Sequence, residues 1–164
     1  MKLVVCGVSG AGKTTVGRLL ASSLEVPFFD ADDFHPPANV EKMRSGIPLT
    51  DADRSPWLGR LAELIAREPS LVLACSALKR RHREQLGIDH ERVQTVFLEG
   101  SKSLIADRIA SRRHDFMPGS LLDSQFDALE PPEGGIVVSI DQTPEAMCAE
   151  VLAQLPRGGR PAAS

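Results

Sequence analysis

The feature that most constrains this chain is a short motif near its start. Residues 7–14, Gly-Val-Ser-Gly-Ala-Gly-Lys-Thr, match the phosphate-loop pattern G-x-x-x-x-G-K-[ST] in full. The apolar run Leu3–Cys6 precedes the motif, and residues 15–21 follow it with the apolar spacing of a helix. A glycine-rich turn that matched by chance would need neither flank. Strand, loop and helix in this order predict an α/β fold that binds a nucleoside triphosphate.

Each part of the motif predicts a separate contact. Backbone N–H groups of the loop would surround phosphate oxygens, and the helix that begins near Lys13 would point its positive end at the same anion. Lys13 would reach the β- and γ-phosphates, while the Thr14 hydroxyl would complete the shell of a Mg²⁺ ion. The residues predicted to bind the nucleotide are Gly7, Val8, Ser9, Gly10, Ala11, Gly12, Lys13, Thr14 and Thr15.

The remaining pattern predicts one α/β domain over residues 1–155. The predicted strands are Leu3–Cys6, Pro27–Asp30, Leu71–Cys75, Val93–Leu98 and Ile136–Ile140. Helical patterns separate most of them, which indicates a parallel sheet covered on both faces. Thr50 should cap a helix that buries Trp57, and Thr143 should cap a last helix ending near Leu155. Residues 156–164 have too little apolar content to fold, so we expect a disordered tail.

Composition excludes several classes of protein. The 164 residues carry a net charge of −3, which argues against a general nucleic-acid binder. The three cysteines, Cys6, Cys75 and Cys148, are odd in number and far apart, as expected of reduced packing residues. No leader pattern opens the sequence, and no apolar run approaches the ~18 residues of a membrane span. We therefore expect a cytoplasmic protein with no membrane or nucleic-acid partner.

Acidic residues follow the second predicted strand, where ligands of a parallel sheet gather. The third strand, residues 71–76, has no carboxylate at its end, so Asp30 is the natural acid for the metal shell. Asp32 lies two residues further on, and the pair could divide the work between the metal and the acceptor hydroxyl. The sequence leaves open which of the two takes the proton. The alternative is a turn whose acids only cap a helix.

Two basic groups are candidates for further contacts. Arg108, Arg112 and Arg113 precede residues 115–119, a plausible flap that would bring Arg112 onto the transferring phosphoryl group. Residues 79–83, Lys-Arg-Arg-His-Arg, follow the third strand and could grip the carboxylate of an acidic acceptor. For both groups the alternative is an exposed, solvated helix face.

Together these motifs resemble the gluconokinase family. The phosphate loop alone is shared by many families, whereas Asp-Ala-Asp-Asp-Phe-His at 30–35 and Cys-Ser-Ala-Leu-Lys-Arg at 75–80 are far more specific. The resemblance extends over residues 7–15, 30–39, 42–43, 46–54, 74–81 and 121–130.

The resemblance implies a three-layer P-loop kinase fold with a five-stranded parallel sheet, nucleoside-monophosphate-kinase-like, with a small lid at about 112–125. It implies transfer of the γ-phosphate of MgATP to the 6-hydroxyl of D-gluconate. The acceptor would lie between two segments, contacting Asp32, Asp33, His35, Lys79, Arg80 and Arg81. Adenine would lie between Arg108 and Pro144, and Arg112 would belong to the lid. Similar enzymes are commonly homodimers.

One departure and three rival functions stand beside this interpretation. Similar proteins place His directly before Phe-Met in the lid, whereas here His114 comes one position earlier and Asp115 fills that place. We expect Asp115 to face solvent or to pair with an arginine. A shikimate-kinase-like enzyme would carry a glycine triplet after the third strand, and a guanine-nucleotide switch would carry Asn-Lys-x-Asp. A polynucleotide-end kinase would need stacking aromatics, but the chain has no Tyr and one Trp.

Overall fold

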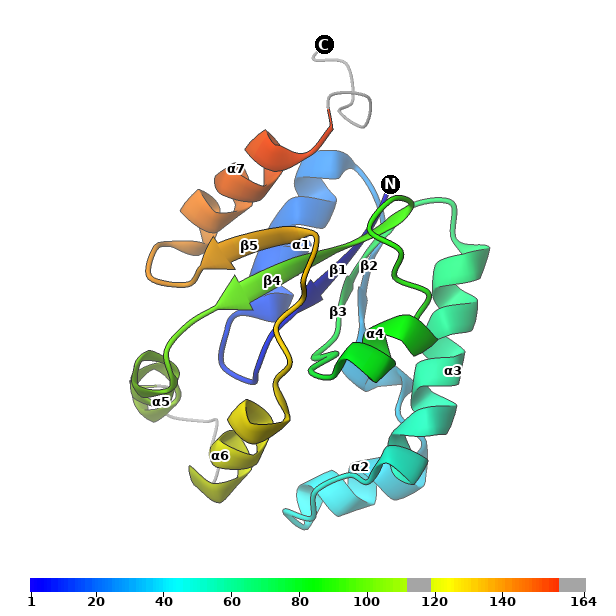
Figure 1. Cartoon of the computed structure of the whole chain (residues 1–164), viewed down its shortest axis with the longest axis vertical. Coiled ribbons are helices and arrows are strands. Elements are labelled where there is room, and N and C mark those ends of the chain that lie inside the picture. The colour runs from blue at the N-terminus through cyan, green and yellow to red at the C-terminus, as the bar shows by residue number, and fades with distance from the viewer. Residues whose placement is uncertain (112–118, 157–164) are drawn as a thin grey trace.

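The apolar segments predicted as strands form one parallel sheet. The computed structural model describes residues 1–111 and 119–156. Its elements, in chain order, are β1 (Lys2–Cys6), α1 (Lys13–Leu24), β2 (Phe28–Asp30), the 3₁₀ helix η1 (Ala31–Phe34), α2 (Pro37–Arg44), α3 (Asp51–Arg67), β3 (Leu71–Ala74), α4 (Arg80–Gln85), β4 (Val93–Glu99), α5 (Lys102–Ser111), α6 (Gly119–Ala128), β5 (Ile136–Ser139) and α7 (Pro144–Gln154) (Figure 1).

The strand order is β2-β3-β1-β4-β5, and every neighbouring pair is parallel. In the central register Val4 lies between Leu73 on β3 and Thr95 on β4. The predicted α/β class and five parallel strands are confirmed, with each strand end within one residue of its predicted position. Of the predicted lid, residues 112–118 lie outside the described residues, whereas 119–128 form α6. The predicted tail also lies outside them from residue 157 onward.

Two apolar cores lie on opposite faces of the sheet. Along β1, Leu3 and Val5 pack into the core beneath α1 and α7, while Val4 and Cys6 pack into the core beneath α3. Because both faces of the strand are buried, its sequence is a continuous apolar run with no polar alternation. This accounts for the strand signal in the sequence.

Helix α3 begins where the sequence predicted. Thr50 Oγ1 accepts a hydrogen bond from the Asp53 N–H (3.1 Å), and Asp53 Oδ2 accepts one from the Thr50 N–H (2.9 Å). This reciprocal pair satisfies two N–H groups at the helix start. Trp57, one turn further on, is 3 % exposed and donates from Nε1 to the Ala31 carbonyl (2.7 Å). Trp57 is thus a core residue, as expected, and it fixes α3 against η1.

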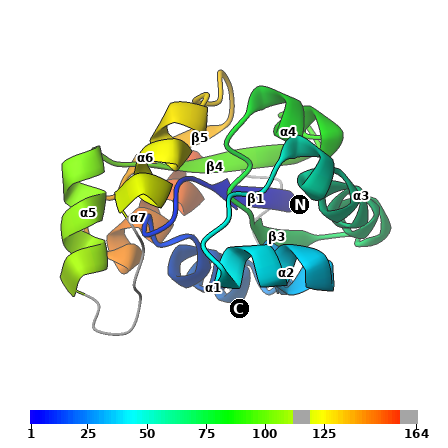
Figure 2. The same ribbon diagram turned by 90° about the horizontal axis from the view of Figure 1, so that it is seen from below.

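The carboxyl ends of the strands meet at one end of the molecule. Helices α2 and α6 lie at this end, on either side of the loop between β1 and α1 (Figure 2). Since parallel strands of such a sheet direct ligands to this end, the residues that follow each strand define the site.

Candidate active site

The phosphate loop has a backbone shape that only glycine adopts easily. Gly10 and Gly12 have φ values of +83° and +95°, in the left-handed region. A Cβ at Gly10 would lie 2.9 Å from Ile109 Cγ1, so α5 packs directly against the loop. Gly12 is the N-cap of α1, and the first N–H groups of that helix therefore face the loop. The arrangement can surround an anion with backbone donors.

Lys13 lies at the first position of α1 and folds back over the loop. Its Nζ donates to the Val8 carbonyl (3.0 Å). Burial, the largest effect, lowers the pKa of Lys13, and the negative charge of Asp32 opposes this shift. A partly desolvated ammonium group held over the loop can neutralise charge on bound phosphates.

Thr14 and Asp30 place two oxygen ligands side by side. Thr14 Oγ1 donates to Asp30 Oδ2 (3.1 Å), which links α1 to the end of β2. Among residues 1–111 and 119–156 no group of three His, Cys, Asp or Glu side chains could hold a metal ion. Mg²⁺ typically takes one or two protein oxygens, with phosphates and water completing its shell. A hydroxyl beside a carboxylate at the edge of a phosphate loop fits that requirement.

Asp32 lies in η1, and the Asp30 side chain fixes the turn that positions it. The Asp32 N–H donates to Asp30 Oδ1 (3.0 Å). Desolvation and the negative charges of Asp30 and Asp33 raise the pKa of the Asp32 carboxyl, while Lys13 lowers it. A carboxylate whose pKa is raised is a better proton acceptor near neutral pH. Asp30 therefore caps the turn, as in the alternative interpretation, and both acids also line the cavity beside the phosphate loop.

His35 lies behind Asp32 in a fixed orientation. Its ring stacks on Trp57 with centroids 4.1 Å apart, and Nε2 lies 4.0 Å from Asp32 Oδ1. Asn39 Nδ2 lies 3.2 Å from His35 Nδ1. Burial and the charge of Arg54 lower the pKa of His35, which favours the neutral ring. With Asn39 as donor, the ring proton is on Nε2 and faces Asp32.

These groups line a single cavity of about 420 Å³. One wall is the phosphate loop with Lys13 and Thr14, and another carries Asp30, Asp32 and His35. The segment 46–49 and Met43 form a third wall that is largely apolar. The fourth wall comes from α6, with Leu121, Ser124, Gln125 and Ala128. The lining thus brings most of the predicted phosphate-loop residues together with Asp30, Asp32 and His35. It does not include the predicted residues Gly7, Val8, Ala11 and Asp33.

Arg54 is a cavity residue that our sequence analysis did not assign to the site. It lies in the first turn of α3, half-buried, and its Nη1 donates to the Leu49 carbonyl (2.9 Å). Lys13 and Arg54 are the basic residues of the lining formed by the described chain. A guanidinium keeps its charge even when burial lowers its pKa, as it does here. Arg54 can therefore hold an anion beside the apolar wall formed by Met43 and residues 46–49.

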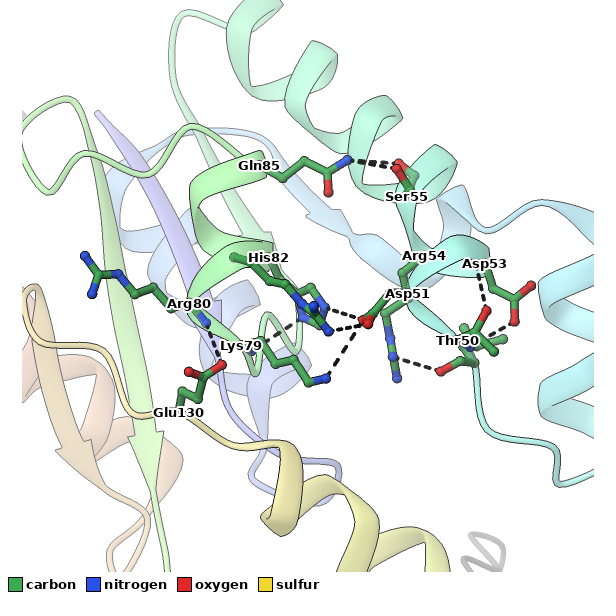
Figure 3. A network of polar contacts seen from close by, with 12 residues as sticks. Thr50, Asp51, Asp53, Arg54, Ser55, Lys79, Arg80, His82, Gln85 and Glu130 are labelled. Atoms are coloured by element: carbon green, nitrogen blue, oxygen red, sulfur yellow. Dashed lines mark hydrogen bonds and ion pairs between the residues drawn. The ribbon is translucent and has the colours of Figure 1, made fainter.

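The basic run at 79–83 does not line the cavity. Lys79, Arg81 and His82 instead gather around Asp51 at the start of α3, and Figure 3 shows Lys79 and His82 directed at Asp51. Arg80 pairs with Glu84 one turn along α4. Arg83 is buried and donates to the carbonyls of Ala77, Leu78 and Glu130. The run is neither a plain solvated face nor, in this state, a direct clamp. Contact of Lys79, Arg80 or Arg81 with an acceptor stays a prediction.

Arg108 is directed toward the end of β5. Its Nη2 donates to the Ile140 carbonyl, so the side chain lies beside the loop that leads to Pro144, the first residue of α7. The structure therefore brings the two predicted adenine neighbours into the same region. Arg112, His114 and Asp115 lie outside the described residues.

Gln125 of α6 holds the phosphate loop, a contact that the sequence analysis did not anticipate. Its Oε1 accepts a hydrogen bond from the Ser9 N–H (2.7 Å), and its Nε2 donates to Ser9 Oγ (2.9 Å). One carboxamide thus satisfies two groups of one loop residue from 116 positions away. The only advance signal was that Gln125 falls in a segment of the family resemblance.

Comparison with known proteins defines the family of this chain. The family described as shikimate kinase matches residues 9–155. A gluconokinase of Gluconobacter oxydans is 48 % identical over 92 % of this chain and 88 % of its own length. A probable gluconokinase of Xenopus tropicalis is 42 % identical over 96 % of this chain and 94 % of its own length. The chain belongs to the gluconokinase family, whose domain is of the shikimate kinase type.

The structural comparison agrees with this membership. The crystal structure of a gluconokinase from Sinorhizobium meliloti superposes with a TM-score of 0.87 at 43 % identity, covering 93 % of this chain and 89 % of that one. The chain is accordingly a kinase of the phosphate-loop superfamily. No helix in the described part of the chain is both long and apolar enough to span a bilayer.

Proposed function

We propose that this protein is a gluconokinase, which transfers the γ-phosphate of ATP to the 6-hydroxyl of D-gluconate and releases 6-phosphogluconate and ADP. One observation carries the proposal: Asp32 and Arg54 line the same cavity as Lys13 of the phosphate loop. A base, an anion-binding group and a phosphate cradle are what a sugar acid and ATP require of one site. Family membership supports the same acceptor.

The phosphate loop and Lys13 would hold the triphosphate and neutralise charge on its outer oxygens. Thr14 and Asp30 would hold Mg²⁺, which would supply further neutralisation of phosphate charge. Asp32 would accept the proton of the acceptor hydroxyl while the oxygen of that hydroxyl forms the bond to the γ-phosphorus. The bond between that phosphorus and the bridging oxygen of ADP breaks in the same step.

Arg54 would bind the carboxylate of the acceptor. A guanidinium matches a carboxylate with two parallel N–H donors. The guanidinium group of Arg54 is already oriented by the hydrogen bond from Nη1 to the Leu49 carbonyl. Lys79 and Arg81 are less suited to this contact, because Asp51 holds both of them. Charge neutralisation by Arg112 and formation of a homodimer stay predictions of the sequence.

A coupled assay of ADP release tests the proposal with gluconate, shikimate, adenylate and an oligonucleotide as acceptors. We expect kcat/KM for gluconate to exceed that for shikimate by at least about 100-fold, since a site built for one set of hydroxyls leaves groups unpaired with another. The match to the shikimate kinase family makes shikimate the second candidate. A higher kcat/KM for shikimate than for gluconate would replace the proposal with that alternative.

A further inference from the structure

We infer that Asp51 is a positioning residue for the acceptor, acting through Arg54. The inference rests on the proposed function for its kinetic consequence. Asp51 is the first residue of α3, and three side chains from the α4 region converge on its carboxylate. We call Asp51, Lys79, Arg81 and His82 the Asp51 clasp.

The Asp51 clasp joins two elements that are far apart in the sequence. Asp51 Oδ1 lies 3.9 Å from Lys79 Nζ and 3.6 Å from His82 Nε2, while Oδ2 pairs with Arg81 Nη2. The side chains of Lys79 and His82 point toward Asp51 from the opposite helix (Figure 3). A second contact one turn further on, from Gln85 Nε2 to the Ser55 carbonyl (3.1 Å), runs in the same direction. The start of α3 is therefore fastened to α4.

His82 makes this fastening more than a surface ion pair. Its side chain is 8 % exposed, and Nε2 is the one buried side-chain polar atom of the described chain without a hydrogen-bond partner. Because His82 Nδ1 accepts the Lys79 N–H (3.4 Å), the neutral ring carries its proton on Nε2. That N–H faces the carboxylate of Asp51. A buried donor aimed at a carboxylate disfavours any movement of α3 away from α4.

Arg54 is the cavity residue that this fastening controls. It lies three residues after Asp51 on the same helical turn, and its hydrogen bond to the Leu49 carbonyl spans the start of α3. Burial, the largest effect, lowers the pKa of Arg54; the charges of Asp51 and Asp53 oppose this shift, and Arg81 adds to it. The Asp51 carboxylate thus offsets the repulsion between the basic run and the guanidinium. We therefore expect Asp51 to influence both the position of Arg54 and the electrostatic potential around its guanidinium group.

A double-mutant cycle separates action through Arg54 from an independent effect. We expect Asp51→Asn to raise the KM for gluconate about tenfold and Arg54→Ala to raise it about 100-fold, with the KM for ATP within twofold in both. In the double variant Asp51→Asn should add less than twofold to the effect of Arg54→Ala. If the KM for gluconate in the double variant rose by the product of the two single-variant factors, action through Arg54 would be contradicted. A lowered KM for gluconate in Asp51→Asn would mean that Asp51 competes with the substrate, which also overturns the inference.

Glu84→Gln is the matched control, because it removes the exposed ion pair with Arg80 on the same helix α4. It should leave the KM for gluconate unchanged. If Asp51→Asn does not fold, Arg81→Gln removes one partner of the clasp and should raise the same KM about threefold. No change with Arg81→Gln would then count against the clasp.

An acceptor-free measurement keeps this inference distinct from the proposed function. Trp57, the one Trp of a chain without Tyr, lies one turn after Arg54 on α3, so intrinsic fluorescence reports this helix. Quenching of Trp57 by acrylamide should increase in Asp51→Asn and not in Glu84→Gln. Suppose that the wild-type protein does not phosphorylate gluconate, but quenching of Trp57 increases in Asp51→Asn. The proposed function would then be wrong, and the fastening of α3 to α4 would still be supported. Identical quenching in all three proteins would overturn the fastening itself.

Discussion

The phosphate side and the acceptor side of the cavity are built in different ways. The phosphate side comes from residues 7–14, where backbone geometry and the start of α1 create the anion cradle. The acceptor side comes from η1, α2 and α3, which are joined by side-chain contacts such as Trp57 to the Ala31 carbonyl and Lys42 to Asp53. The Asp51 clasp fastens α3 in turn to α4. The acceptor side also exposes Met43 and Ile47 by 42 % and 51 %. The first side is specified locally, and the second by residues that meet only in the folded chain.

The largest expected effect lies on the phosphate side. Lys13→Ala should reduce kcat by about a thousandfold or more, because it removes the cation that neutralises charge on the transferring group. Lys2→Ala is a control at the opposite end of β1, where Lys2 Nζ donates to the Ile65 carbonyl. It should keep wild-type kinetics. If Lys13→Ala retained a tenth of the wild-type rate, Lys13 would have no place in the mechanism.

Asp32 lies where the two sides meet, and its removal should be the next largest effect. Asp32→Asn should lower kcat about 100-fold or more and leave the KM for ATP nearly unchanged. Since the pKa of Asp32 is raised above the ordinary value of 3.8, wild-type kcat should fall as the pH drops through that raised pKa and the carboxylate is protonated. A pH profile of kcat should lose this acidic limb in the variant. If the acidic limb persisted in Asp32→Asn, it would report the titration of another side chain.

Gln125 tests whether the phosphate side also depends on a distant contact. Gln125→Ala should raise the KM for ATP about three- to tenfold, because Ser9 loses both hydrogen bonds that orient it. Gln125→Glu should raise it further, since a carboxylate repels bound phosphates. The KM for gluconate measures the other side of the cavity in the same variants and should stay constant. Equal changes in both would show that the two sides are not independent.

The smallest effects concern the start of α3. Thr50→Ala should lower the free energy of unfolding by about 1 kcal/mol and raise the KM for gluconate a few-fold, because the helix that carries Arg54 frays. Thr143→Ala removes the corresponding cap of α7. It should cost similar stability, measured by urea unfolding, without changing that KM. If the KM for gluconate rose in both variants, a general loss of stability would be the cause.

Acid provides an independent test of the same cap. Hydrogen bonds from Lys42 and from Thr50 lower the pKa of Asp53 from 3.8 to about 2. The unfolded chain therefore binds the proton first, and the stabilising contribution is complete above about pH 4 and is lost as pH falls toward 2. Asp53→Asn should flatten this part of the stability profile.

Local patterns predicted most of the fold and half of the site. Continuous apolar runs such as Leu3–Cys6 are typical of strands buried on both faces, and Thr50 and Thr143 carry the cap chemistry in their own sequence neighbourhoods. Lys13 and Thr14 were assigned from one motif. These features depend on residues a few positions apart, for which spacing is a sufficient guide.

The remaining site residues depend on contacts that spacing does not encode. Arg54 resembles any exposed arginine of a helix until the first turn of α3 is placed beside the cavity. The basic run at 79–83 suggested a clamp because nothing near it in the sequence reveals that Asp51, about thirty positions earlier, neutralises it. Gln125 needed the pairing of α6 with Ser9, which only the folded chain provides.

The buried Arg83 restrains the chain at the C-terminal end of the α6 wall of the cavity. Its Nη2 donates to the Glu130 carbonyl (2.7 Å), and the Glu130 N–H donates to the Leu78 carbonyl (2.8 Å). The chain just beyond α6 is thereby tethered through both backbone groups of one residue to the turn that follows β3. The C-terminal end of α6 is therefore a restrained edge of the cavity wall, because a displacement there would break hydrogen bonds of the buried Arg83 and of the Glu130 backbone.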